Sequence, residues 1–175
     1  MATGTSRSIV DRMRGAATLD VATYEEVEHD ETATGQAGVV VVLAAIAAGI
    51  GAAGRGGPGI VGMVIASLLG WAVWAGITYV VGTRLFGGTA TWGELLRTVG
   101  FAQAPGVLAV LAIIPVLGVL VRLALFCWML ATSFVAVRQA LDIGNGKTVL
   151  TVLVGAIGYI VVNMIAFGLL GLGMR

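Results

Sequence analysis

The sequence predicts an all-α polytopic membrane protein, in which a five-helix transmembrane bundle follows a short amphipathic and acidic helical segment in the cytosol. Two observations support this fold class. Of the 175 residues, 58% are hydrophobic and 11% are charged, whereas soluble domains carry about 25% charged residues. Ten of the 19 charged residues lie before Thr32 and give that segment a net charge of −4. The chain therefore divides into a cytosolic headpiece, residues 1–31, and a transmembrane domain, residues 32–175.

The headpiece is predicted to contain two short helices. Ser8 is a favourable N-cap for a helix that runs to about Ala17, with apolar residues on one side and charged residues on the other. Such a helix can lie on the inner leaflet or pack on the bundle. Thr23 and Glu26 have capping-box spacing, which predicts that a second helix starts at Thr23. We expect this second helix to run straight into the first span.

The first two spans follow from uncharged runs. From Thr32 to Gly54 the sequence has 23 residues without a charge. A helix of this length reaches ~35 Å, which is enough for the ~30 Å hydrocarbon core of a bilayer. This run predicts a span over residues 36–54. The next uncharged run predicts a span over residues 58–83, with Arg84 just beyond it as an interfacial anchor.

The remaining spans follow from a longer apolar stretch and a final one. Residues 98–137 are interrupted only by Arg122. One helix over these residues would be ~60 Å long, about twice the thickness of the hydrocarbon core, so the stretch must form two spans. Proline and glycine in the segment Pro115–Gly118 favour a reversal there. The predicted spans are residues 98–114, 119–138 and 148–172.

The basic residues that flank the spans predict the orientation of the chain. Cytoplasmic loops of membrane proteins are enriched in Lys and Arg. With the N-terminus inside, seven of the ten basic residues lie on the inner face, and Arg55, Arg122 and Arg175 lie on the outer face. We therefore expect an integral membrane protein with a cytoplasmic N-terminus and an external C-terminus.

The sequence offers no arrangement of residues that is typical of catalysis. The spans contain no Asp, Glu, Lys or His near their centres, so a proton relay lacks its usual carriers. No nucleophile and base lie close together along this topology, so we predict no catalytic residues and no enzymatic activity. Glu25 and His29 would share a helix face, but two ligands are fewer than the four of a structural zinc site. We expect no metal site and no cofactor.

Three residues inside the spans are of special interest because they are polar or distort a helix. Pro105 frees a carbonyl group about four residues earlier, near Phe101, and Gln103 is placed to bond with it in a kinked helix. Asn163 can bridge neighbouring helices. Structural roles are the first interpretation of Gln103, Pro105 and Asn163, and a substrate site is the second.

Glycine is abundant, with 27 residues, and many of them lie within the spans. Small residues recur at helical spacing, as in Ala66 with Gly70 and in Gly155 with Gly158. Small faces let helices approach closely. They predict either tight packing within one bundle or the interface of a homo-oligomer.

Three stretches of the sequence resemble the Yip (Ypt-interacting protein) domain family of five-span membrane proteins. In the stretch Leu95–Pro105, Gly100, the aromatic Phe101 and Pro105 are similar to the family's signature of Gly-Tyr and then Pro in the third span. The stretch Thr23–Asp30 with Gly35–Ala37 is similar to the prokaryotic branch of the family, so the resemblance implies a prokaryotic cell membrane. The stretches are Thr23–Asp30 with Gly35–Ala37, Leu95–Pro105, and Ile114–Gly118 with Val135–Leu141 and Lys147.

The resemblance implies a cytosolic N-terminus, five helices and, in eukaryotic relatives, a role in membrane trafficking through small GTPases and partner membrane proteins. This sequence lacks the Asp-Leu-x-Gly-Pro type motif that precedes the first span of those relatives. The family has no catalytic residues that could be carried over to this chain.

The leading functional hypothesis is a non-enzymatic integral membrane protein that organises membrane or recruits partners through its acidic headpiece. Expected partners are membrane lipids, and other membrane proteins or a second copy of the chain, without nucleic acid. The alternative is a lipid-handling or small-solute conduit built around Gln103, Pro105 and Asn163. The residues predicted to form the docking surface are Tyr24, Glu25, Glu26, Glu28 and Asp30.

Overall fold

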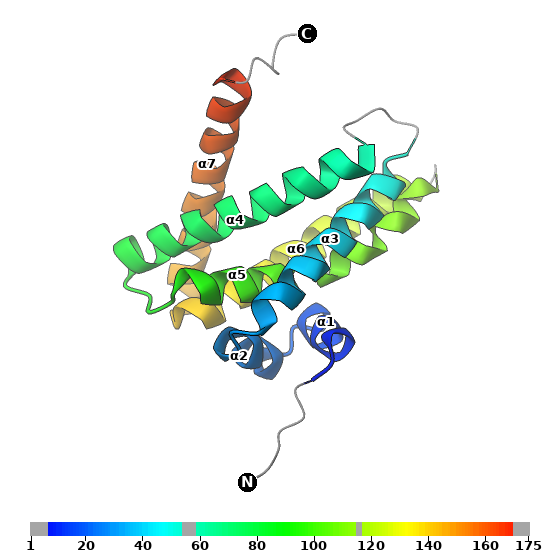
Figure 1. Ribbon diagram of the computed structural model, residues 1–175. Helices are drawn as coiled ribbons and strands as arrows, with labels where there is room; N and C mark the ends of the chain where they lie inside the picture. Colours follow the sequence, from blue (N-terminus) through cyan, green and yellow to red (C-terminus); the bar gives the residue numbers. More distant parts are fainter. Residues whose placement is uncertain (1–6, 54–58, 115–116, 170–175) are drawn as a thin grey trace.

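The computed structural model describes residues 7–53, 59–114 and 117–169, and these residues form helices and no strands (Figure 1). Two short helices come first, and longer apolar helices follow. The helices are α1 (Ile9–Ala17), α2 (Val21–His29), α3 (Ala33–Gly51), α4 (Gly59–Phe86), α5 (Trp92–Phe101), the 3₁₀-helix η1 (Ala104–Ile113), α6 (Gly118–Leu141) and α7 (Asn145–Leu169).

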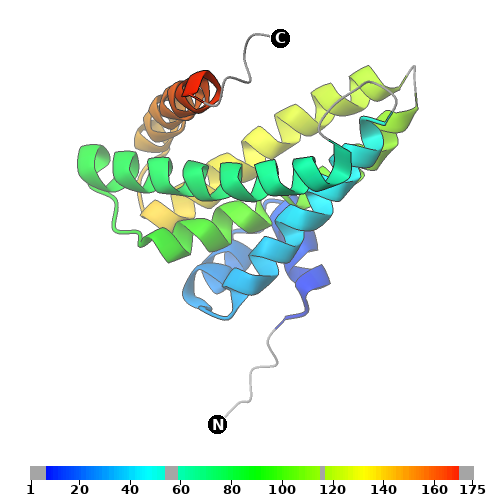
Figure 2. The same ribbon diagram turned by 45° about the horizontal axis from the view of Figure 1, so that its top comes forward.

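Five helical segments of the described chain are long and apolar enough to cross a membrane. This finding confirms the predicted all-α, five-helix fold class. Helix α3 packs against α5 and η1, and α6 packs against the other side of η1. Helix α4 packs against α3 and also contacts α7, and the C-terminal part of α7 extends away from the other helices (Figures 1 and 2). The membrane-length segments are Ala33–Gly51, Gly59–Phe86, Trp92–Ile113, Gly118–Leu141 and Asn145–Val162.

The outer faces of the long helices are apolar. Helix α4 buries only Ala75, Thr78 and Gly82, and its other residues are half-buried or exposed. Large apolar residues such as Val61 and Leu69 on this helix are exposed in the isolated chain. An exposed apolar surface of this extent is stable in a lipid bilayer and not in water.

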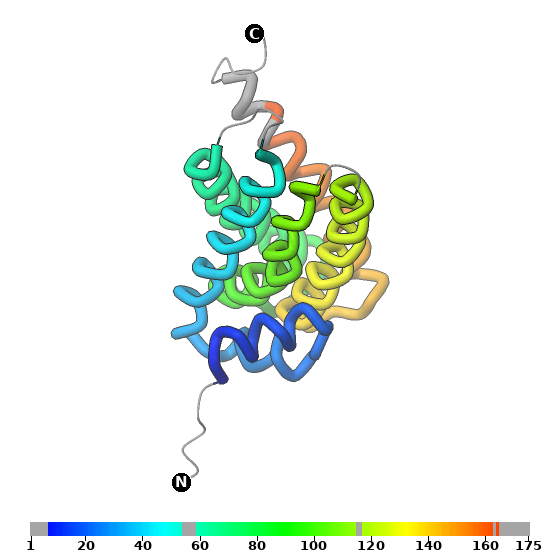
Figure 3. The backbone as a smooth tube through the Cα atoms, turned by 90° about the vertical axis from the view of Figure 1, so that its right-hand side faces the viewer, coloured from blue at the N-terminus to red at the C-terminus, as the bar shows by residue number. Residues whose placement is uncertain are grey.

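The headpiece helices α1 and α2 lie across one end of the bundle (Figure 3). The main buried core lies at this end, where α2, α3, α5 and α6 meet. Tyr24 and Val27 of α2 are completely buried there, together with Leu95 and Phe101 of α5. The headpiece is therefore packed onto the bundle as part of the same folded unit.

The start of α1 is as predicted, but the start and end of α2 are not. The Oγ of Ser8 accepts a hydrogen bond from the backbone N of Asp11 at 3.2 Å and caps α1. Helix α2 begins at Val21 with Asp20 as its N-cap, so the predicted capping box at Thr23 is wrong. The hydroxyl of Thr23 instead donates to Asp20 at 2.6 Å and is buried.

Helix α2 also does not continue into the first span. It ends at His29, and the next residue, Asp30, has an extended backbone conformation. The Asp30 carboxylate accepts hydrogen bonds from the backbone N of Thr32 at 3.0 Å and from its hydroxyl at 2.5 Å. This local pairing breaks the helix, because Asp side chains that bond to the following backbone favour turns. The expectation of one continuous helix is wrong.

The third membrane-length helix starts at Trp92, before the predicted start at residue 98. Thr91 and Glu94 form a complete capping box at its N-terminus. A search for uncharged runs excluded this segment because it contains Glu94 and Arg97. Glu94 is bonded to the backbone of Thr91, and Arg97 donates to backbone carbonyls of α2, so both charges are accommodated and the helix extends beyond the uncharged run.

The same segment changes from an α-helix to a 3₁₀-helix around Pro105. Helix α5 ends at Phe101, and η1 follows with Gln103 as its N-cap and Pro105 in its first turn. Proline has no backbone N–H to donate, so it fits the first turn of a new helix better than the middle of a long one. The predicted reversal at Pro115 involves residues 115–116, which lie outside the described residues.

Several of the small residues bring helices of the same chain together. A Cβ on Gly158 would lie 3.2 Å from Ile77, and a Cβ on Gly155 would lie 3.3 Å from Thr78, so these glycines let α7 approach α4. A Cβ on Gly100 would lie 2.7 Å from Ala37 of α3. These faces serve packing within one bundle.

Candidate functional site

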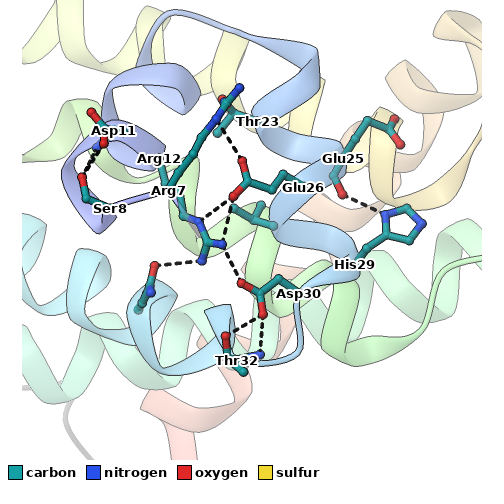
Figure 4. A network of polar contacts seen from close by, with 12 residues as sticks. Arg7, Ser8, Asp11, Arg12, Thr23, Glu25, Glu26, His29, Asp30 and Thr32 are labelled. Atoms are coloured by element: carbon teal, nitrogen blue, oxygen red, sulfur yellow. Dashed lines mark hydrogen bonds and ion pairs between the residues drawn. The ribbon is translucent and has the colours of Figure 1, made fainter. Parts of the chain in front are cut away.

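Arg12 joins the two headpiece helices to the first span (Figure 4). Its side chain comes from α1 and is 1% exposed. The guanidinium donates to the carboxylate of Glu26 on α2 at 3.0 and 3.2 Å and to Asp30 at 2.6 Å. It also donates to the amide oxygen of Gln36 on α3 at 3.0 Å. One buried cation therefore ties three helices together.

The charges in this network stabilise one another. Burial alone would lower the pKa of Arg12, but hydrogen bonds and charge interactions with Asp30 and Glu26 raise it. The pKa of Asp30 is lowered, first by its hydrogen bond from Thr32 and then by Arg12. In a buried ion pair with this many hydrogen bonds, the interactions offset most of the free energy lost on desolvation. Loss of one partner strongly destabilises the folded protein, because the other charge stays buried.

Arg97 forms a second attachment of the headpiece to the bundle. Its guanidinium reaches from α5 to the last turn of α2, where Nε donates to the carbonyl oxygens of Val27 and Glu28 at 3.0 Å. Nη2 also donates to the carbonyl of Glu28. The last carbonyls of a helix lack partners within the helix and carry partial negative charge. A cation at this position is therefore favourable.

Two aromatic residues complete the attachment. The hydroxyl of Tyr24 donates to the carbonyl of Ala16 at 3.0 Å, and burial raises the pKa of this hydroxyl. The indole N–H of Trp128 on α6 donates to the carbonyl of Ala17 at 2.7 Å. Both bonds satisfy carbonyl groups at the end of α1, so they fix this helix against α2 and α6.

The five residues predicted to form the docking surface lie on or beside α2 but point in different directions. Tyr24 and Glu28 are buried. Glu26 and Asp30 face Arg12, as described above. Glu25 is half-buried, and its Oε1 accepts a hydrogen bond of 2.5 Å from the Nε2 of Gln139 on α6. Glu25 therefore bonds directly to the bundle, whereas Tyr24, Glu26 and Asp30 bond to α1 within the headpiece.

Glu28 has an unusual environment for a carboxylate. It is 6% exposed, and its buried Oε2 has no hydrogen-bond partner among the described residues. Burial, with a further contribution from the negative charge of Glu25, raises the pKa of Glu28 to about 7. One ligand atom from each of Glu25, Glu28 and His29 lies within 4.8 Å of the others. Sequence reasoning paired Glu25 with His29 and missed Glu28.

A half-open cavity of about 760 Å³ lies between α3, α4, η1, α6 and Tyr159 of α7. Alanine, methionine and aromatic side chains supply most of its wall. The predicted polar residue Gln103 lines this cavity, and its side chain makes no hydrogen bond within the part of the chain that the structure describes. Pro105, two residues further along the chain, is buried. The side chain of Asn163 lies outside the described residues. Other polar residues in the wall are Ser67, Arg122 and Ser133.

Arg12, Arg97 and Arg122 were not predicted as site residues. Arg12 and Arg97 looked like ordinary markers of the cytoplasmic face. For Arg12, the available signal in the sequence was the run of carboxylates in the segment that follows it. For Arg97, it was the position of a charge directly before a long apolar stretch. Only the tertiary structure shows which partners they have.

The helical architecture and the apolar outer surface define a polytopic α-helical integral membrane protein. The sequence matches the Yip1 domain family over residues 21–167, and the chain belongs to this family. The match begins at the first residue of α2 and reaches into α7, so it includes every membrane-length segment. The comparisons with curated proteins and with solved structures found no match.

Proposed function

We propose that this Yip1-type membrane protein is not an enzyme and that it binds a membrane lipid in the half-open cavity between α3, α4, η1 and α6. The cavity itself carries this proposal. Its volume of about 760 Å³ lies within the range of roughly 300–1,000 Å³ that is typical of small-molecule sites. A site for a lipid must be mainly apolar and must also offer a few polar groups.

The wall of the cavity meets both requirements. Ala44, Ala45 and Ala48 of α3 leave space for hydrocarbon, and Trp71 and Trp74 of α4 provide large apolar surfaces. Small side chains at these positions keep the cavity open, since close packing would otherwise fill it. The apolar part of the wall is therefore suited to acyl chains.

The polar residues of the wall are suited to a headgroup. Arg122 lies near the N-terminus of α6 and combines an exposed side chain with a position in the cavity wall. Guanidinium groups bind phosphate through paired hydrogen bonds. Gln103 provides an amide that has no partner among the described residues. This arrangement favours an anionic phospholipid, with its phosphate at Arg122 and an acyl chain in the cavity.

The test is photo-cross-linking of a diazirine-labelled phosphatidylglycerol to the purified protein in phosphatidylcholine vesicles. In the variant Ala48→Phe, the larger side chain fills the cavity, and we expect most of the cross-linking to be lost. Ala124→Phe is the matched control, because Ala124 is exposed on α6 and is not part of the wall. Equal labelling of the two variants would exclude a lipid site in the cavity.

Arg122→Gln separates headgroup recognition from simple occupation of apolar space. We expect unlabelled phosphatidylglycerol and unlabelled phosphatidylcholine to compete equally well with the labelled lipid in this variant, whereas phosphatidylglycerol competes better in the unmodified protein. An unchanged preference would show that Arg122 does not bind the headgroup. A separate assay of lipid scrambling in the same vesicles distinguishes lipid binding from a conduit.

Recruitment of partners by the headpiece is the second candidate function. It is supported by the rigid attachment of α1 and α2, which presents a fixed surface with exposed Val10, His29 and Glu31. A preorganised surface loses less entropy on binding than a flexible one. Glu31→Lys should change the set of co-purifying proteins, whereas the control Arg14→Glu on the exposed side of α1 should not. An identical set in both variants would count against docking at α2.

The similarity of Thr23–Asp30 with Gly35–Ala37 to prokaryotic relatives supports assignment to the prokaryotic branch of the family. The distribution of basic residues supports a cytoplasmic N-terminus and an external C-terminus. We include both in the proposal.

A further inference from the structure

Three potential metal ligands lie together on one face of α2. Glu25, Glu28 and His29 have the spacing i, i+3 and i+4, which places side chains side by side on a helix. One ligand atom from each residue lies within 4.8 Å of the others. Figure 4 shows Glu25 and His29 on the side of α2 away from Arg12, so this cluster is separate from the ionic network described above.

Glu28 is the residue that points to a ligand. It is only 6% exposed, so more than nine-tenths of it is buried, and its Oε2 has no hydrogen-bond donor among the described residues. A buried carboxylate without a partner is unfavourable unless a proton or a cation completes it. Glu25 and His29 are the neighbours that could share such a cation.

The hydrogen bond of His29 leaves one ring nitrogen available to a metal. Nδ1 lies 2.8 Å from the backbone carbonyl oxygen of Glu25. A carbonyl oxygen can only accept, so Nδ1 carries the hydrogen and Nε2 has the lone pair in the neutral ring. Metal-binding histidines commonly donate their other N–H to a carbonyl or a carboxylate in this way.

The remaining contacts of the cluster also fit a cation. The Oε1 of Glu25 accepts from Gln139 at 2.5 Å, which orients the carboxylate and leaves Oε2 for a ligand. The charges of Glu94 and Asp142 act on Glu28 from α5 and from the end of α6 and add negative potential. Arg97 is the opposing cation nearby, but its guanidinium is engaged by backbone carbonyls.

We propose that Glu25, Glu28 and His29 form a binding site for a divalent transition-metal ion of the zinc and cobalt type. Two carboxylates and one imidazole, with a position left for water, make a ligand set that Zn²⁺ accepts. Mg²⁺ and Ca²⁺ prefer oxygen ligands only. Zinc bonds to these atoms are about 2.0–2.2 Å long, so small rotations of exposed His29 and half-buried Glu25 would close the site.

The experiment is a titration of Co²⁺ into the full-length protein, purified in detergent without a histidine tag and freed of metal with a chelator. Visible absorption of Co²⁺ reports the number and geometry of its ligands, and competition with Zn²⁺ gives the zinc affinity. We expect one bound ion per chain. We expect His29→Ala and Glu28→Gln each to weaken binding by at least about tenfold, as the loss of even an outer-shell partner does in known sites.

Glu31→Gln is the matched control, because Glu31 is an exposed carboxylate two residues from His29 and outside the cluster. Binding by this variant should equal that of the unmodified protein. Zn²⁺ should also raise the melting temperature of the unmodified protein and of Glu31→Gln, but not that of His29→Ala, which folds normally because His29 is exposed. The proposal is wrong if the unmodified protein takes up no stoichiometric ion, or if all variants bind alike.

Discussion

At the scale of single residues, most charged side chains of α2 pack inside the protein or form ion pairs and do not form an exposed acidic surface. A run of carboxylates in a sequence favours a solvated acidic face, and this was the basis for the predicted docking surface. The structure places Glu26 and Asp30 against a buried Arg12 and leaves Glu28 buried, with no partner for its Oε2 among the described residues. Sequence spacing shows which residues share a helix face, but it does not show what lies opposite that face. The positions of Arg12 and Arg97 depend on contacts between residues far apart in the chain.

Replacement of Arg12 by Ala should destabilise the headpiece. The change leaves Glu26, Asp30 and Gln36 without their shared donor, and breaking a buried ion pair costs roughly 3 kcal/mol. We expect a lower melting temperature and faster proteolysis of the segment before α3. Arg14→Ala is the control, because Arg14 is exposed on the same helix. Equal stability of the two variants would mean that the Arg12 network contributes nothing to folding.

At the scale of elements, local signals predicted helix starts when the capping residue was unambiguous. Ser8 stands at the start of an amphipathic segment and caps α1 as predicted. For α2 the prediction placed the cap at Thr23, whereas Asp20 caps the helix and Thr23 is buried. The capping box of Thr91 and Glu94 was not predicted, because uncharged runs do not include a helix start that carries a charge. A charge near a helix start can be a capping residue, so runs without charge underestimate the length of such a helix.

The N-cap of α2 should make the headpiece sensitive to low pH. The Asp20 pKa is lowered, first by the hydrogen bond from Thr23 and then by the one from the backbone of Ala22. A lowered carboxylate pKa contributes stability that is present above the unfolded-state pKa and is lost as pH falls through the folded-state value. Asp20→Ala should cost about 1 kcal/mol at neutral pH.

The measurement is the melting temperature of Asp20→Ala and of the unmodified protein between neutral pH and pH values below the ordinary range of aspartate. The difference between them should shrink as the solution becomes acidic. Asp11→Ala serves as a comparison, because the exposed Asp11 lies in the first turn of α1 and is not the cap of that helix. A constant difference at all pH values would show that the charge of Asp20 is unimportant.

Packing of α3 on α5 predicts a sharp difference between two glycines. A Cβ on Gly100 would lie 2.7 Å from the Cβ of Ala37 and 3.2 Å from Trp71, which is too close without movement of a helix. Gly100→Ala should therefore destabilise the protein by about 1–3 kcal/mol. Gly35 lies within α3, and a Cβ added there would meet no heavy atom within 4 Å among the described residues. Gly35→Ala should raise stability by up to about 1 kcal/mol, since alanine favours helix. Thermal unfolding in one detergent compares the two, and a similar loss in both would contradict this interpretation.

At the scale of the whole molecule, composition was enough to predict the class of fold and the number of spans. Hydrocarbon tolerates few charges, so the spacing of charges along the chain reveals where the membrane begins and ends. The cavity and the packing of the headpiece on the end of the bundle could not be predicted in this way. Both arise from the shape left between helices, such as the space beside Ala48, and from side-chain pairing between α1, α2 and α3. Composition carries no information about either.

The orientation of the molecule in the membrane is the last prediction, and it depends on the whole charge distribution. In the five-span topology, seven of the ten basic residues lie on the same face as the headpiece. Because cytoplasmic loops are enriched in Lys and Arg, this face is expected to be cytoplasmic. In a Cys127→Ser background, Ala53→Cys at the end of α3 should react with a membrane-impermeant maleimide added to intact cells. Asp11→Cys and Gly144→Cys should react only after permeabilisation, because both positions are exposed but on the inner face. The opposite pattern would place the headpiece outside and would remove any cytosolic partner from consideration.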